Sequence, residues 1–148
     1  MSQATHTTDV VVIGGGPGGY TAAFLAADRG MSVTLVDEAP RPGGVCLYRG
    51  CMPSKALLHA AKVVNDARQA SVFGVSFGSP SIDVDRLRGW KNDVVLKLTG
   101  GLAQLAKQRG ITCLQGRATF TDAQALAVDI KSDAESSAVV RFRHAIVA

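Results

Sequence analysis

Two cysteines, Cys46 and Cys51, are separated by only four residues. Thiols this close can form and break a disulfide without moving the rest of a fold, and they can also bind a metal. A structural zinc site needs two further ligands, but Cys113 lies in a segment typical of a strand and the histidines at positions 6, 59 and 144 are scattered. Two buried, unreactive cysteines are the other alternative. We favour a redox-active disulfide and expect no metal site.

The spacing of the thiols restricts the backbone between them. Five residue steps along a straight α-helix rise about 7.5 Å, whereas a disulfide usually needs Cα atoms within about 7 Å of each other. The segment therefore cannot be a regular helix while the disulfide is formed. Gly50 adds backbone freedom, and Pro53 suits the first turn of a helix, whose N-terminus lowers the pKa of a thiol. Lys55 would project from the same helix face as Cys51.

A glycine-rich segment precedes the thiol pair by about 30 residues, which is the spacing of one strand–helix–strand unit. It follows an apolar run and contains the pattern G-x-G-x-x-G. In a dinucleotide-binding turn the first glycine permits the tight turn, the second lets the backbone approach a pyrophosphate, and the third lets the helix pack close to the strand. The N-terminus of that helix favours phosphate. The residues concerned are Gly14, Gly16 and Gly19, with Pro17 and Gly18 between them.

A β-α-β unit is predicted over residues 9–38, with two short apolar strands around a helix that Gly30 ends. The right-handed parallel crossover is strongly preferred for such a unit. Asp37 stands at the end of the second strand, where a carboxylate can hydrogen-bond a ribose diol. Its neighbour Glu38 could compete for this role.

The remaining elements complete an α/β fold. Two amphipathic helices are predicted over residues 54–109, the second interrupted by Gly100 and Gly101. A third parallel strand follows, and then short strands at 117–143 that indicate an antiparallel meander. Residues 144–148 begin another strand, so we expect a truncated domain in which a parallel sheet is joined to a small meander.

The composition narrows the class of protein. With 148 residues, 47% hydrophobic and 19% charged, the chain has the size and make-up of one globular domain. The net charge is +4 without a long basic run, and aromatic residues are few, which disfavours a nucleic-acid partner. No apolar run is long enough to span a membrane, and residues 1–8 lack a signal pattern. We therefore expect a cytoplasmic location.

The thiol segment resembles the active-site segment of the FAD-dependent pyridine nucleotide–disulfide oxidoreductases, and 12–20 resembles their FAD fingerprint. Within that family the dihydrolipoamide dehydrogenases are the most similar. Pro-Ser-Lys at 53–55 disfavours glutathione reductases, which usually have two lysines there, whereas mercuric reductases also carry Pro-Ser-Lys and stay an alternative. The resemblance covers essentially the whole chain and rests on Gly43-Gly44-x-Cys46-Leu47-x-x-Gly50-Cys51-x-Pro53-Ser54-Lys55-Ala56-Leu57.

The resemblance implies a Rossmann-like FAD-binding domain, of which residues 1–148 are the N-terminal portion, with the redox-disulfide segment at 43–55. It implies that Cys46 is the thiol that exchanges with the substrate, that Cys51 contacts the flavin ring, and that Lys55 lies near flavin N5. The FAD-binding residues implied are Gly14, Gly16, Pro17, Gly18, Gly19, Asp37, Glu38, Gly43, Gly44, Val45, Cys46, Lys55 and the backbone of Ala118.

This chain departs from the family pattern at a few positions. Asp37 stands where relatives more often have Glu, and Val45 replaces a common threonine, so that one hydroxyl contact to FAD is missing. Tyr48 and Arg49 replace a common Asn-Val pair, which places an additional cation beside the thiols.

The resemblance also implies an activity for the full-length protein. Dihydrolipoamide, or another dithiol, would be oxidised through the Cys46–Cys51 disulfide and FAD to NAD⁺, in a homodimer whose NAD-binding domain, dimer domain and acid/base His–Glu pair lie outside these 148 residues. The fragment alone is then expected to be inactive and to hold FAD weakly. The alternative from a different class is a stand-alone nucleotide-binding or interaction module.

Overall fold

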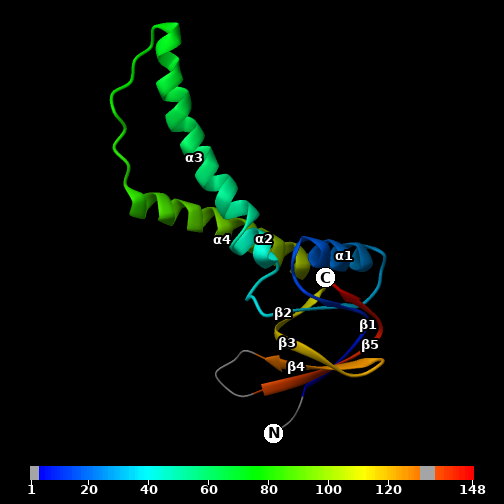
Figure 1. The fold of residues 1–148 in the computed structure, drawn as a ribbon. Coiled ribbons are helices and arrows are strands. Elements are labelled where there is room, and N and C mark those ends of the chain that lie inside the picture. Colours follow the sequence, from blue (N-terminus) through cyan, green and yellow to red (C-terminus); the bar gives the residue numbers. More distant parts are fainter. Residues whose placement is uncertain (1–3, 131–135) are drawn as a thin grey trace.

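The computed structural model describes residues 4–130 and 136–148, which form a mixed α/β fold as the sequence predicted. Strands and helices alternate in the first part of the chain, and strands dominate the last part (Figure 1). The elements are β1 (Ala4–Ile13), α1 (Pro17–Asp28), β2 (Val33–Asp37), α2 (Gly44–Tyr48), α3 (Cys51–Gln69), the short 3₁₀ helix η1 (Ala70–Phe73), α4 (Val84–Gln108), β3 (Thr112–Asp122), β4 (Ala125–Ile130) and β5 (Ser136–Val147).

The parallel part of the sheet has the strand order β3-β2-β1-β5. β1 pairs in parallel with both β2 and β5, and β2 pairs in parallel with β3. The order 3-2-1 is that of the first half of a Rossmann fold. Residues Val33–Val36 of β2 are all buried, which explains why this strand is a continuous apolar run rather than an alternating one.

The antiparallel part closes the sheet on itself. The second half of β3 pairs with β4, and β4 pairs with β5, so that the strand pairings form a closed ring. The antiparallel pairing predicted for this region is present, although residues 131–135 lie outside the described part. The third parallel strand and the first strand of the meander were predicted as separate elements, but they form one continuous strand, β3. Gly116 lies within it and allows close pairing, because a Cβ there would collide with the Asp129 carbonyl of the neighbouring strand.

β1 and β5 are longer than the sequence indicated. The apolar run predicted a strand only from Asp9, but Ala4–Thr8 also pair with Ala138–Phe142 of β5. The predicted separation of residues 139–142 from 144–148 is likewise absent, since β5 is continuous. Polar threonines can occupy this stretch of β1 because its residues are mostly exposed. Residues 1–3 lie outside the described part.

Two apolar clusters hold the body together, one on each face of the parallel strands. Alternate residues of β1 serve both, because side chains alternate along a strand. The first cluster lies against α1 and the end of α4 and contains Val10, Val12, Ala23, Ala26, Val33, Leu35, Ala106 and Ile111. The second lies between the parallel strands and the meander and contains Val11, Val36, Leu126, Val128, Val140 and Phe142.

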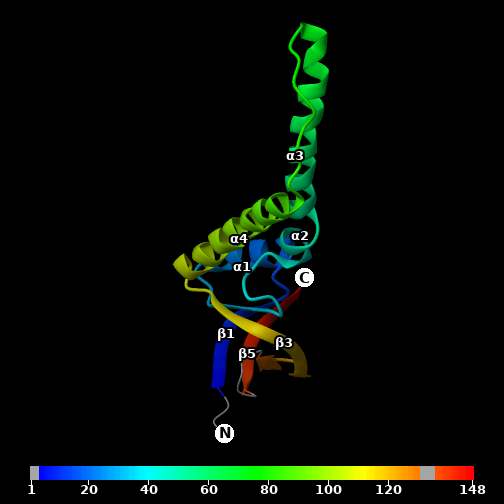
Figure 2. The same cartoon turned by 90° about the vertical axis from the view of Figure 1, so that its left-hand side faces the viewer.

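Helices α3 and α4 form a hairpin that projects from the body (Figures 1 and 2). The predicted apolar face of α3 is largely uncovered, with Leu57 42% exposed and only Ala56 buried. The predicted interruption of α4 at Gly100 and Gly101 was also wrong, because the helix is continuous. Each internal glycine costs about 1 kcal/mol relative to alanine, and the burial of neighbouring Thr99 against the body offsets that cost.

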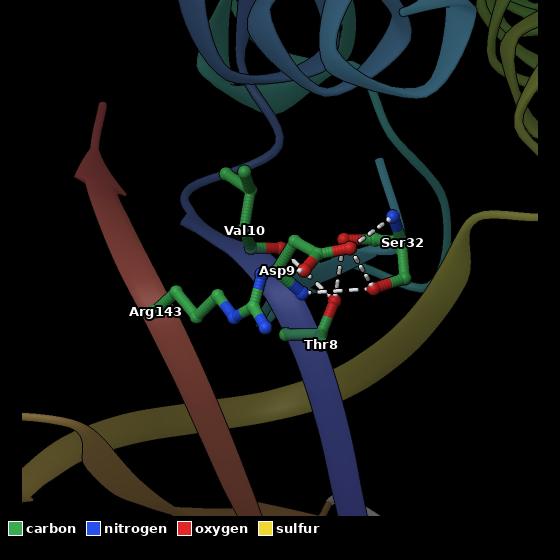
Figure 3. Close-up of polar contacts among 5 residues, drawn as sticks. All are labelled: Thr8, Asp9, Val10, Ser32 and Arg143. Carbon is green, nitrogen blue, oxygen red and sulfur yellow. Dashed lines mark hydrogen bonds and ion pairs between the residues drawn. The ribbon is translucent and has the colours of Figure 1, made fainter. Parts of the chain in front are cut away.

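A polar cluster joins β1 to the start of β2 (Figure 3). The Asp9 carboxylate accepts hydrogen bonds from the Ser32 backbone N–H at 2.9 Å and hydroxyl at 2.7 Å, and the Asp9 N–H donates to the Ser32 hydroxyl at 2.8 Å. The Thr8 hydroxyl donates to the Ser32 carbonyl, and Arg143 of β5 lies 3.4 Å from Asp9. These groups connect three neighbouring strands.

Candidate functional site

The glycine turn after β1 has the close packing that the sequence predicted. Gly14 adopts a φ of +102°, and its N–H donates to the Val36 carbonyl at 2.8 Å. A Cβ on Gly19 would overlap the Gly14 carbonyl, so α1 can approach the turn only because this residue is glycine. Gly16 caps α1 without a side-chain hydrogen bond, and Pro17 occupies the first turn. The backbone N–H groups of this helix end are therefore directed at any anion placed there.

Asp37 braces this turn from the end of β2. Its Oδ2 accepts the Gly15 N–H at 2.6 Å, and its Oδ1 accepts the Ala39 N–H at 2.7 Å. An ionised carboxylate has about four acceptor positions, so a diol can still bind beside these backbone donors. Sequence reasoning missed the bracing role. Part of it was detectable, because an Asp that bonds the N–H two residues on forms a common turn.

The thiol segment and the glycine turn are in direct contact. The Gly43 N–H donates to the Gly15 carbonyl at 2.7 Å. Gly44 adopts a φ of +56° and lies so close to Gly16 that a Cβ would come within 2.5 Å of the Gly16 Cα. Thr99 of α4, which is fully buried, packs behind Gly43. The structure thus brings together two motifs that are far apart in the sequence.

The two thiols lie on either side of a break between helices. Cys46 is in α2 and half-buried, whereas Cys51 is exposed as the first residue of α3, and the two are not joined by a disulfide in this structure. The backbone leaves helical geometry at Arg49 and Gly50, so the segment is not a regular helix even without a disulfide. Ser54 stabilises the break by donating its hydroxyl to the Gly50 carbonyl at 3.0 Å. The sequence had assigned no role to this serine.

Cys51 affects the ionisation of the Cys46 thiol. A hydrogen bond to the Cys51 side chain, partial desolvation and repulsion from Cys51 raise the pKa of the Cys46 thiol above its ordinary value. The Cys51 backbone N–H and the Lys55 ammonium act in the opposite direction. The net shift of the Cys46 pKa is upward, because the contacts with the Cys51 side chain outweigh the opposing effect of the backbone N–H at the start of α3.

Two cavities open around the end of β2. The first has a volume of about 520 Å³ and lies where the thiol segment meets β2. The second, of about 360 Å³, lies between the glycine turn and β3 and includes Gly14 and Ala118. Both are bordered by Asp37 and Glu38, whereas Cys46, Cys51 and Lys55 line neither. The first cavity is lined by Asp37, Glu38, Ala39, Pro40, Gly44, Val45, Tyr48 and Arg49.

The donor set around these cavities fits a dinucleotide such as FAD. Carboxylates at the end of β2 suit a ribose diol, the uncapped start of α1 suits a pyrophosphate, and the loop that leads to the thiols contacts the glycine turn. Among residues 4–130 and 136–148, no three metal-ligating side chains come together. Within the same ranges no helix combines the length and apolar character needed to cross a membrane.

Comparison with known proteins gives consistent matches. The family model "Pyridine nucleotide-disulphide oxidoreductase" matches residues 8–148. A "Dihydrolipoyl dehydrogenase" of Haemophilus influenzae is 48% identical over 95% of this chain and 29% of its own length. Proteins with similar names from Vibrio parahaemolyticus, 47% identical over 94% of this chain, and Haloarcula marismortui, 43% identical over all of it, are covered to 29% and 31% of their lengths. The chain thus spans less than a third of these relatives.

Proposed function

Since residues 8–148 match its model, the chain belongs to the pyridine nucleotide-disulphide oxidoreductase family, and from this premise we propose that it is the N-terminal portion of the FAD-binding domain of a flavin-linked disulfide oxidoreductase. The observation that carries the proposal is the contact between the thiol segment and the glycine turn, made by the Gly43–Gly15 hydrogen bond and the packing of Gly44 on Gly16. This contact holds the loop that leads to the two thiols against the glycine turn.

The cofactor-binding roles are distributed over three elements. We propose that the turn at 14–19 and the start of α1 bind the pyrophosphate, that Asp37 or Glu38 binds the ribose, and that the backbone at Ala118 meets the adenine. Gly43, Gly44 and Val45 line the path from this site to the thiols. FAD, when bound, supplies a two-electron acceptor beside the thiol pair. Support comes from the two cavities, which share the carboxylates of β2.

We propose that each cysteine takes the role that the family resemblance implies. With the pair oxidised, a substrate thiolate attacks the Cys46 sulfur, which breaks the Cys46–Cys51 bond and releases Cys51 as a thiolate. The second substrate thiol then attacks the mixed disulfide after losing its proton to a base, and Cys46 leaves. The substrate loses two electrons and the cysteine pair gains them. Lys55, whose charge acts on Cys46, favours the thiolate form of Cys46, and Cys51 would be the thiol that contacts the flavin when FAD is bound and accepts the two electrons from the pair.

We propose dihydrolipoamide as the dithiol, supported by the names of the relatives at 43–48% identity. The full-length protein would pass the electrons to NAD⁺ and act as a homodimer in the cytoplasm, with the NAD-binding domain and the acid/base pair outside these 148 residues. Dithiol chemistry at a reduced cysteine pair is suited to that reducing compartment.

The test is the spectrum of the full-length protein that contains this chain. We expect it to carry a yellow flavin and to develop a long-wavelength absorption band when dihydrolipoamide reduces the cysteine pair. Cys51→Ser should abolish this band. The matched control Cys113→Ser should keep it, because Cys113 lies in β3, outside the thiol segment, and lines neither of the two cavities. A colourless protein contradicts the proposal. A yellow protein that reduces mercuric ion but does not oxidise dihydrolipoamide would keep the family assignment and replace the proposed substrate.

A further inference from the structure

Among the described side chains that line the first cavity, one is a cation, and it has no role in the proposed function. This cation is Arg49, which stands between the two cysteines in the sequence and follows the last residue of α2. The other charged side chains of the lining are the carboxylates of Asp37 and Glu38 at the end of β2. The cavity therefore combines acceptors for hydroxyl groups with one guanidinium.

The backbone of Arg49 is held by its neighbours. Its N–H donates to the Val45 carbonyl at 2.9 Å, and its φ of −135° and ψ of −11° end the helix there. The adjacent Tyr48 hydroxyl donates to the Arg41 carbonyl at 3.2 Å, which ties this turn to the loop after β2. The side chain is exposed at the cavity instead of being packed in the core.

One wall of the same cavity, Gly44, packs against the start of α1. Gly44 lines the cavity and packs directly on Gly16, the N-cap of α1. A nucleotide whose ribose binds a carboxylate of this cavity and whose phosphates bind the start of α1 would lie along the wall formed by Gly44, in the cavity that Arg49 also lines. A guanidinium donates hydrogen bonds in a planar fork that matches phosphate oxygens. The polarity of the cavity thus matches the alternation of diol and anion in a dinucleotide.

We propose that Arg49 is a further cofactor-binding residue, whose guanidinium pairs with the pyrophosphate of the bound dinucleotide and adds a full positive charge to the partial charge at the start of α1. This inference rests on the proposed function. It differs from a role in substrate electrostatics, since it predicts an effect on the affinity for the cofactor and not on the dithiol.

The experiment measures cofactor affinity directly in the full-length protein after FAD has been removed. FAD and ADP are titrated into wild type, Arg49→Gln, Arg49→Lys and the control Arg68→Gln, an exposed arginine in the last turn of α3. We expect Arg49→Gln to raise the Kd for both ligands about tenfold, which corresponds to about 1.4 kcal/mol. Arg49→Lys should fall between it and wild type, and Arg68→Gln should match wild type. The salt dependence of binding should also be weaker in Arg49→Gln.

The outcomes separate this inference from the proposed function. If Arg49→Gln binds FAD and ADP as wild type does, the inference is wrong while the proposed function stands. If only the KM for the dithiol changes, Arg49 acts on the substrate and the inference is again wrong. A wild-type protein that binds neither FAD nor ADP contradicts the proposed function itself. Thermal melting of each variant without ligand checks folding, and Arg49→Lys keeps the test decisive if Arg49→Gln melts early.

Discussion

Cys46 is subject to opposing effects from two residues at the start of α3. Cys51 raises the pKa of the Cys46 thiol through a hydrogen bond and repulsion, and Lys55 lowers it through its charge. We therefore expect Cys51→Ala to lower the pH at which Cys46 becomes reactive, and Lys55→Gln to raise it. The rate of Cys46 alkylation against pH, followed by peptide mass in the reduced protein, measures both shifts. Identical midpoints in the three proteins would show that these contacts do not control the thiol.

Gly44 makes the closest contact between the thiol segment and the glycine turn. Because its φ is +56° and a Cβ would come within 2.5 Å of the Gly16 Cα, we expect Gly44→Ala to lower the free energy of unfolding by about 1–3 kcal/mol and to weaken FAD binding. The control is Gly89→Ala in α4, where an added Cβ meets nothing within 4 Å. That change should stabilise the protein by about 1 kcal/mol. Urea denaturation of both variants checks the opposite signs, and shifts in the same direction contradict the account.

The residues that make up the site were predictable from the sequence, whereas the contacts between them were not. The glycine pattern and the Cys46–Cys51 spacing indicated a nucleotide turn and a paired thiol because these motifs are local in the sequence. The Gly43–Gly15 hydrogen bond joins residues from separate loops, and the bracing of Gly15 by Asp37 depends on strand pairing. Such nonlocal contacts have no sequence spacing to reveal them. The roles of the cofactor-binding residues stay predictions.

At the scale of elements, Arg109 joins the end of α4 to α1. Its Nε donates to Asp28 Oδ1 at 2.9 Å, and its guanidinium carbon lies 4.9 Å from the centre of the Phe24 ring. We expect Arg109→Ala to destabilise the fold by about 1 kcal/mol, since both an ion pair and a cation–π contact are lost. Arg88→Ala, which removes an exposed pair with Asp85 within α4, should have a near-zero effect. Thermal melts of the two variants compare them, and equal melting temperatures would refute this role of Arg109.

The cluster around Asp9 gives the fold a dependence on pH. Hydrogen bonds from the Ser32 hydroxyl and backbone hold the pKa of the Asp9 carboxyl below its ordinary value. A lowered folded-state pKa stabilises the protein fully above the unfolded pKa, about 3.9, and this stabilisation is lost as the pH falls through the lower folded-state value. Asp9→Asn should therefore melt earlier than wild type at pH 6, and the difference should shrink below about pH 3.9. Melting curves across this range test it, and a constant difference would contradict it.

The elements of the β-α-β unit were predictable because their apolar runs and glycine stops are local. The sequence did not reveal that Ala4–Thr8 extend β1, because their pairing with β5 involves residues more than 130 positions away. The amphipathic spacing of α4 also did not reveal which of its residues contact the body. Val95, Thr99 and Ala106 are buried, whereas the large apolar side chains of Trp90 and Leu98 are 40% and 39% exposed. Amphipathic spacing shows that a helix has an apolar face, but not which part of it contacts the body.

For the molecule as a whole, the body and the helical hairpin differ in how completely they are packed. The body has two apolar clusters, while the hairpin exposes large side chains such as Leu58, at 67%, and Phe73, at 82%. The chain also spans only 29–31% of the length of the relatives compared above. The fold class was predictable from the alternation of strands and helices, but the closure of the sheet was not, since it depends on β3 and β5 each serving two neighbours.

The central claim is that Cys46 and Cys51 act as one redox pair beside a dinucleotide site. The most direct measurement is a count of alkylated cysteines, residue by residue, in the full-length FAD-loaded protein before and after anaerobic addition of dihydrolipoamide. We predict that Cys46 and Cys51 are protected in the oxidised protein and become labelled together after reduction, while the exposed Cys113 is labelled in both states. Labelling of Cys46 and Cys51 that is the same before and after reduction would contradict the account.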